Sequence, residues 1–204
     1  MPPQNKELVV ATSNQGKVNE LRNLLGGLSL SLYSLADFPD IHEIPETGHR
    51  FRENACIKAA GYALQTGITS LADDSGLEVL ALDGRPGIHS ARYVGSDIPF
   101  SIKMEKLLGE LASTGDVERR ARFVCSIAVA DAAGRILADT EGICDGKIAQ
   151  APRGNAGFGY DPIFIPDGYE QTFGELSDTI KQTISHRFRA FDQIFPFLQH
   201  FTAL

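Results

Sequence analysis

The chain has 204 residues, of which 43% are hydrophobic, and this length supports one substantial core better than two independent domains. Its 19 basic and 26 acidic residues give a formal net charge of −7, which argues against a broad basic surface for nucleic acid. No stretch reaches the roughly 18 apolar residues of a membrane span, and residues 1–7 lack the pattern of a signal peptide, so neither is expected.

Apolar spacing and turn residues predict the elements of the first half of the chain. In order, they are a buried strand over 7–11, a polar turn over 12–16, a helix over 17–25, a strand over 28–34, an irregular loop over 36–48 and a helix over 51–66.

In the second half of the chain, the same signals predict short strands followed by a pair of long strands. A strand over 70–72 runs into Asp73-Asp74-Ser75-Gly76 and is followed by a short apolar stretch over 77–81. Further along come a loop over 83–94, a helix over 98–111, antiparallel strands over 119–130 and 135–145, a glycine-rich loop over 151–160, a strand over 163–165, a partly helical stretch over 173–181 and a helix over 185–201 capped by Ser185. This pattern favours a mixed α/β sheet with flanking helices.

The three cysteines, Cys56, Cys125 and Cys144, are far apart and form no CxxC pair. A disulfide framework or zinc site is therefore not expected. Small buried side chains in a reducing cytoplasm are the simpler interpretation.

A polar turn opens the first helix at Thr12, Ser13, Asn14, Gln15, Gly16 and Lys17. A helix N-terminus offers unpaired backbone N–H groups at the positive end of the helix dipole, which suits a phosphate, and Lys17 adds a mobile charge. Ordinary helix capping by Thr12, Ser13 or Asn14 explains the same residues.

Two adjacent carboxylates, Asp73 and Asp74, leave an apolar strand. A hard cation such as Mg²⁺ would compensate their charge, and Glu46 in the preceding loop could reach a metal. Neighbouring strand residues point to opposite faces, so only one of the two aspartates is expected at any one site. A turn capped by aspartate is the alternative.

Two further groups suit a flat anionic ligand. In Gly157-Phe158-Gly159-Tyr160-Asp161, the glycines allow the backbone and an aromatic ring to approach a flat ligand closely. Ser185-His186-Arg187 gathers donors at a helix start, four residues after Lys181. Core aromatics in a tight turn and a simple helix cap are the alternatives.

The combination and order of these motifs resemble the inosine triphosphate pyrophosphatase family, over about residues 9–198. The matching pieces are the 12–17 turn, PETG at 45–48, ENACIKA at 53–59, ADDSGL at 72–77, PGIHSARY at 86–93, GFGYDPIF at 157–164 and SHR at 185–187. Two positions depart from the family pattern: Ser13 stands where glycine is usual, and Glu46 is a single glutamate where many relatives have two.

The resemblance implies an elongated mixed α/β fold, residues 1–204 forming a single domain with two lobes around an active-site cleft, and a homodimer. It implies Mg²⁺ bound by Asp74 and Glu46, with Asp74 also the proton acceptor. As substrate contacts it implies Ser75, the triphosphate-binding residues 12–17 and Lys181, and, as base and nucleotide contacts, Phe158, Gly159, Tyr160, Asp161, His186 and Arg187.

The implied reaction is hydrolysis of inosine, deoxyinosine or xanthosine triphosphate to the monophosphate and pyrophosphate. Such a displacement needs positioning and charge neutralisation more than covalent chemistry from the protein. Two alternatives remain: a Maf-like pyrophosphatase for modified pyrimidine triphosphates, and a non-catalytic nucleotide-binding protein.

Overall fold

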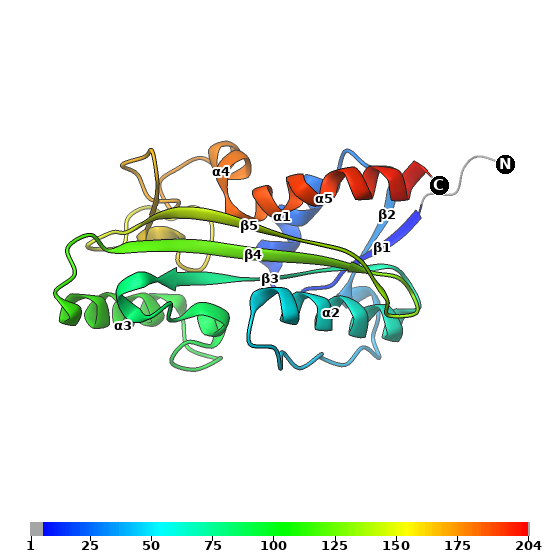
Figure 1. The fold of residues 1–204 in the computed structure, drawn as a ribbon, viewed down its shortest axis with the longest axis horizontal. Helices are drawn as coiled ribbons and strands as arrows, with labels where there is room; N and C mark the ends of the chain where they lie inside the picture. The colour runs from blue at the N-terminus through cyan, green and yellow to red at the C-terminus, as the bar shows by residue number, and fades with distance from the viewer. Residues whose placement is uncertain (1–5, 204) are drawn as a thin grey trace. The chain divides into compact units, whose positions relative to one another are not determined.

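The computed structural model describes residues 6–203. A six-stranded sheet has the order β2-β1-β3-β4-β5-β6, with β1 parallel to both β2 and β3 and with β6 antiparallel to β5. The predicted mixed α/β sheet with flanking helices is therefore confirmed (Figure 1). The strands are β1 (Lys6–Val10), β2 (Leu30–Ser34), β3 (Ser70–Val79), β4 (Arg120–Ala130), β5 (Ile136–Ile148) and β6 (Phe164–Pro166).

The α-helices of the described chain are α1 (Gln15–Leu25), α2 (Phe51–Thr66), α3 (Phe100–Thr114), α4 (Asp178–Ile184) and α5 (His186–Ala203). Short 3₁₀ turns cover Leu35–Asp37, Leu80–Leu82, Gly87–Arg92 and Asp161–Ile163. The chain divides into two compact units. Unit 1 comprises residues 1–74, 125–142 and 190–204, and unit 2 comprises residues 75–124 and 143–189.

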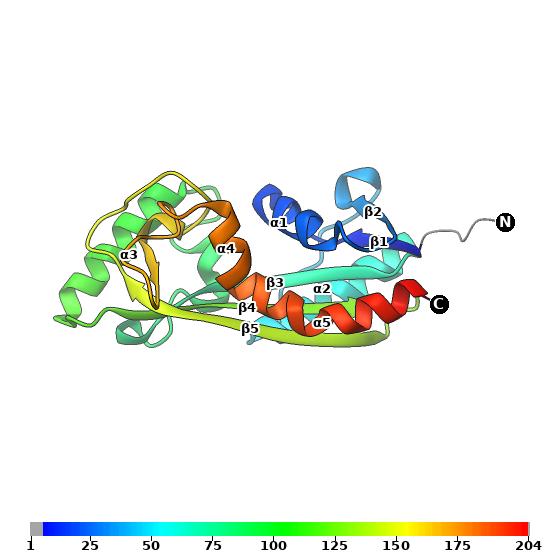
Figure 2. The same ribbon diagram turned by 90° about the horizontal axis from the view of Figure 1, so that it is seen from above.

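Unit 1 buries both faces of its strands. On one face, α1 and α5 cover a cluster that includes Leu8, Leu71 and Ile127. On the other face, the small side chains of α2 pack against Ala72 and Ala128, so that this helix lies close to the sheet. Figure 1 shows α2 and α5 on opposite sides of these strands, and Figure 2 shows α1 next to β1 and β2.

Unit 2 has its own core. Leu107 and Leu111 of α3 pack with Leu77 and Val79 of β3, and aromatic side chains of β4 and β6 complete the cluster. Phe123 and Phe164 lie 4.6 Å apart between ring centroids, which is the spacing of an attractive tilted aromatic pair.

The predicted break at Asp73-Asp74-Ser75-Gly76 is wrong, because β3 is one continuous strand from Ser70 to Val79. The turn alternative fails with it. The polar residues 73–75 can remain in this buried strand because each of these three has a partner: Lys17 for Asp73, Lys58 for Asp74 and Arg187 for Ser75.

Other boundaries move by a few residues. The helix expected over 51–66 is observed at those bounds, while the one expected over 98–111 begins after Pro99 and ends at Thr114. The stretch expected to be partly helical over 173–181 becomes helical only at Asp178, after Ser177 caps it. Ser185 accepts the Phe188 N–H, so the predicted cap of α5 is confirmed.

Two expectations based on what the sequence lacks can be compared with the described residues. Across residues 6–203, none of the helices combines the length and the apolar character that a membrane crossing requires. The three cysteines are free thiols, and Cys125 and Cys144 are buried.

Candidate functional site

The turn between β1 and α1 is a capped helix N-terminus. The Asn14 side-chain oxygen accepts the Lys17 N–H at 3.2 Å, and the Thr12 hydroxyl accepts the Asn14 N–H at 3.2 Å. These two hydrogen bonds are the ones expected from ordinary helix capping by Thr12 and Asn14. Residues 12–17 still place a helix N-terminus beside the end of β1, so their role as phosphate contacts stays a prediction.

Asp73 and Asp74 point to opposite faces of β3, as the strand period requires. Asp73 forms an ion pair with Lys17 of α1 at 3.1 Å and lies 3.8 Å from the Cys125 sulfur. Asp74 instead contacts α2, where it accepts hydrogen bonds from Asn54 and Lys58. The structure therefore directs Lys17 to Asp73 rather than to the predicted metal ligand Asp74.

Glu46 and Asp74 converge on one ammonium group. The Lys58 Nζ lies 2.8 Å from a Glu46 oxygen and 3.1 Å from a carboxylate oxygen of Asp74. Burial alone would lower the pKa of Lys58, but the carboxylates of Asp74, Asp73 and Glu46 outweigh it and raise that pKa. Burial raises the pKa of Asp74, and the ammonium groups of Lys58 and Lys17 offset part of this effect.

The donor set around Lys58 suits a hard cation. Among residues 6–203 no group of three or more His, Cys, Asp or Glu side chains could hold a metal ion, and the carboxylates of Glu46 and Asp74 are two oxygen donors that both contact Lys58. Mg²⁺ is commonly bound through one or two carboxylates together with water and substrate phosphates. The residues present therefore fit Mg²⁺ in a substrate complex better than a closed all-protein metal site.

Sequence reasoning missed Lys58 and Asn54. The informative spacing is between Asn54 and Lys58, which are four residues apart on α2 and both reach Asp74. A polar i, i+4 pair on the otherwise alanine-rich inner side of a helix was the available signal.

In unit 2, Asp161 organises the loop that carries Phe158. Its Oδ2 atom accepts the Lys181 Nζ at 2.6 Å and the Phe158 N–H at 2.7 Å, and both charged side chains are buried. Gly157 has a φ of +72°, and a Cβ there would lie 2.0 Å from Asp161 Oδ2. Glycine is therefore required for the loop to close on this carboxylate.

The Phe158 ring lies beside two cations. The Lys181 Nζ is 4.7 Å and the Arg187 Cζ 5.7 Å from its centroid, and both distances fall within the range of cation–π attraction. Arg187 also donates to the Ser75 hydroxyl at 3.0 Å. Unit 2 thus brings together five of the predicted substrate contacts: Ser75, Phe158, Asp161, Lys181 and Arg187.

The remaining predicted contacts in unit 2 are packed more deeply. The His186 ring stacks on Phe123, with centroids 4.7 Å apart and planes 13° apart. Tyr160 is buried, and its hydroxyl donates to the Ser90 carbonyl. Burial raises the pKa of this phenol well above its ordinary value. Gly159 lies near the Phe100 ring, so Gly159 and Tyr160 join the loop to the core.

Asp161→Asn is expected to destabilise the fold. It leaves Lys181 without a buried countercharge, at a cost of about 1–3 kcal/mol. For a chain of this size the melting temperature should fall by roughly 2–4 °C for each kcal/mol. Differential scanning calorimetry measures the shift. Asp167→Asn, which removes an exposed ion pair with Arg120, is the control and should change Tm far less. Equal shifts in the two variants would contradict the proposed importance of the buried pair.

A family model described as the Ham1 family matches residues 8–197 of this chain. The chain belongs to the Ham1 family. The resemblance inferred from the motifs is thereby confirmed.

Relatives of this Ham1 chain carry consistent names. A dITP/XTP pyrophosphatase of Halalkalibacterium halodurans is 47% identical over 192 residues, covering 93% of this chain and 97% of the relative. A dITP/XTP pyrophosphatase of Geobacter sulfurreducens is 47% identical over 183 residues, covering 90% and 92%.

Solved structures agree with the fold of the Ham1 chain. A HAM1 protein from Coxiella burnetii superimposes with a TM-score of 0.87 at 39% identity, covering 96% of this chain and 99% of the other. A nucleoside-triphosphatase (dITP/XTP pyrophosphatase) from Mycobacterium abscessus gives a TM-score of 0.74 at 41% identity, covering 94% and 99%.

Proposed function

We propose that this chain hydrolyses dITP, ITP and XTP to the nucleoside monophosphate and pyrophosphate, and so removes non-standard purine nucleotides from the nucleotide pool. The observation that carries the proposal is the convergence of Glu46 and Asp74 on Lys58. Support for the substrate class comes from two relatives, each 47% identical, that are named dITP/XTP pyrophosphatases.

In this proposal, unit 1 holds the metal and the triphosphate. Glu46 and Asp74 would hold Mg²⁺, which when bound neutralises phosphate charge and favours departure of pyrophosphate. Asp74 accepts the proton of the attacking water. Lys58 keeps the two carboxylates in place. Lys17 supplies an ammonium group that neutralises charge on the phosphates, since phosphoryl-type displacements depend on positioning and charge neutralisation.

Unit 2 recognises the base in the same proposal. Phe158 provides a stacking surface, and base–aromatic stacking contributes about 1–3 kcal/mol. Arg187 and His186 donate hydrogen bonds to the 6-keto oxygen of the purine, with Ser75 holding the Arg187 guanidinium. Asp161 and Lys181 fix the loop around Phe158, and Lys181 also supplies positive charge to the substrate.

Several broader features are part of the proposal. Residues 1–204 act as a single two-lobed domain, because β3 and α5 each contribute residues to both units and neither unit is one continuous segment. The family resemblance supports a homodimer, and the free thiols are consistent with a reducing cytoplasm.

Metal removal gives the sharpest test of the reaction class. Pyrophosphate release from ITP, dITP, XTP, dTTP and ATP is measured with Mg²⁺, with EDTA, and after Mg²⁺ is restored. Hydrolysis of the first three should stop with EDTA and return with the metal, because the carboxylates of Glu46 and Asp74 need a hard cation to approach a triphosphate.

Other outcomes of this panel select the alternatives. A preference for pyrimidine triphosphates would favour a Maf-like activity. Binding of ITP without pyrophosphate release would make the chain a nucleotide-binding protein. Full activity after exhaustive chelation would contradict the assignment of Glu46 and Asp74 as metal ligands.

A further inference from the structure

The predicted metal ligand Glu46 lies on a long irregular segment. Between the 3₁₀ turn Leu35–Asp37 and the start of α2 at Phe51, the chain forms no helix or strand. The position of the Glu46 carboxylate therefore depends on the bonds that hold residues 38–50 to the rest of unit 1. Those bonds run almost entirely to α2.

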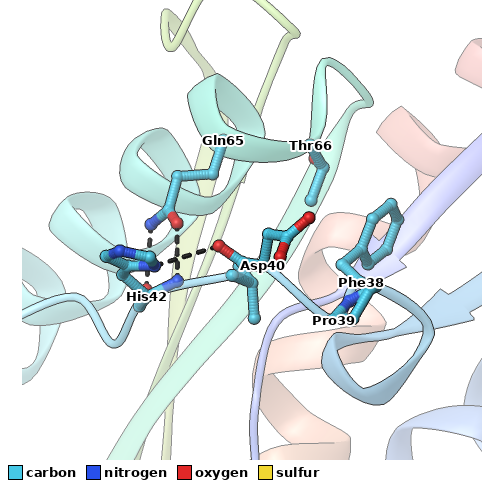
Figure 3. Close-up of a pocket in the computed structure, with 7 residues that line it drawn as sticks. Phe38, Pro39, Asp40, His42, Gln65 and Thr66 are labelled. Carbon is cyan, nitrogen blue, oxygen red and sulfur yellow. Dashed lines mark hydrogen bonds between the residues drawn. The ribbon is translucent and has the colours of Figure 1, made fainter.

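The beginning of this segment is held by the last turn of α2. The Gln65 side chain accepts the His42 N–H at 2.7 Å and donates to the His42 carbonyl at 2.9 Å, as Figure 3 shows. The same residues line a surface pocket of about 570 Å³. Further on, Ile44 packs against Gly61, where a Cβ would lie 2.6 Å from its side chain.

The end of the segment is held by the first turn of α2 through Asn54, which is fully buried. Its Oδ1 atom accepts the Gly48 N–H at 2.8 Å, two residues beyond Glu46. Its Nδ2 atom donates to Asp74 Oδ2 at 3.2 Å. Gly48 permits this approach, because a Cβ there would lie 2.7 Å from Asn54 Oδ1.

We propose that Asn54 is the positioning residue that sets both carboxylates of the metal site, an inference that rests on the proposed function. One end of its amide fixes the loop of Glu46, and the other end occupies one oxygen of Asp74. The second oxygen of Asp74 is thereby directed to the Lys58 ammonium group, which also donates a hydrogen bond to Glu46. Residues that orient metal ligands in this way commonly affect affinity by about 10–100-fold.

The test is direct metal binding in the complex with a non-hydrolysable ITP analogue, because one or two carboxylates bind such a cation together with substrate phosphates. Mn²⁺ binding to Asn54→Ala is measured by electron paramagnetic resonance and should be about 10–100-fold weaker than in the parent protein. Raising Mg²⁺ should restore much of kcat for ITP, because the ligands themselves remain. Gln193→Ala, which removes an amide-to-carbonyl bond to Glu141 elsewhere in unit 1, is the matched control and should bind Mn²⁺ normally.

A second pair of variants keeps the proposal testable if Asn54→Ala does not fold. Gly48→Ala keeps the Asn54 side chain but places a Cβ 2.7 Å from both Asn54 Oδ1 and Glu53 Cβ, so it should displace the Gly48 end of the segment and also weaken Mn²⁺ binding. Gln65→Ala loosens only the far end of the segment and should have a smaller effect. Parental Mn²⁺ affinity in folded Asn54→Ala and in Gly48→Ala, or an equal loss in Gln65→Ala, would overturn the role of Asn54.

Failure of the proposed function would give a different set of results from failure of the positioning role of Asn54. Glu46→Gln and Asp74→Asn are assayed for Mn²⁺ binding in the parent background. If neither weakens binding, the metal site itself is misplaced and the proposed function fails with it. If both weaken binding while Asn54→Ala and Gly48→Ala do not, only the positioning role of Asn54 is lost.

Discussion

Asp74→Asn is expected to lower kcat for ITP by roughly 10²-fold or more while leaving the protein folded. The substitution changes almost no volume, but it removes the proposed proton acceptor and one of the two carboxylates that converge on Lys58. Stopped assays of pyrophosphate release measure the loss, and circular dichroism checks the fold.

Asp139→Asn is the matched control for this experiment. Asp139 is a carboxylate of unit 1 that pairs with Arg52 and contacts neither Glu46 nor Lys58. Its variant should keep parental kcat. An Asp74→Asn protein with near-normal turnover would remove Asp74 from the mechanism and leave Lys58 bridging the two positions for structural reasons alone.

Arg187→Ala is expected to reduce kcat/KM far more with ITP than with ATP. Hypoxanthine presents a 6-keto acceptor, whereas adenine presents an amino donor that would face the donors of Arg187 and His186. Each unpaired buried group costs about 1–3 kcal/mol. Two such conflicts correspond to a discrimination of roughly 10²- to 10⁴-fold, which the variant should largely lose.

The structure shows how Arg187 could be held for this task. Its guanidinium is fully buried, bonded to Ser75 and adjacent to the Phe158 ring. Kinetics with both nucleotides measure the change in preference. Arg189→Ala, two residues further along α5, removes a bond to the Ile143 carbonyl and should leave the preference unchanged.

A uniform effect would carry a different meaning. If Arg187→Ala slows ITP and ATP by the same factor, the guanidinium serves the phosphates or the scaffold of unit 2. Base discrimination would then rest on other groups around Phe158. Arg187→Lys helps to separate these cases, because it keeps the charge but loses the planar pair of donors.

Much of the fold could be predicted because its signals are local. The helix over 51–66 is bounded by Gly67 in the left-handed conformation and carries an unbroken helical sequence. The family could also be inferred, since several ordered motifs occur together over most of the chain. Such features depend on neighbouring residues and are visible in one sequence.

The rest depended on contacts that sequence spacing does not encode. Three polar residues followed by a glycine at 73–76 resemble a turn, and only the presence of Lys17, Lys58 and Arg187 lets the polar residues stay in a strand. The partnership of Glu46 with Lys58 joins a loop to a helix across a tertiary fold. Likewise, nothing local distinguishes a Tyr160 packed in the core from one offered to a ligand.

The unbroken course of β3 also limits how this gene can change by insertion and deletion. Along the strand, Asp73 forms an ion pair with Lys17 of α1, and Asp74 accepts a hydrogen bond from Asn54 of α2. The next residue, Ser75, accepts a hydrogen bond from Arg187. Adding or removing one residue before Asp73 would turn every later side chain to the opposite face. Removing one residue would bring Asp74 to the place where Asp73 now faces Lys17, and adding one would bring it to the place where Ser75 now faces Arg187, so in either case it would leave Asn54 and Lys58. Substitutions in β3 can be tolerated one position at a time, but a change of length there would exchange the two chemical environments at once.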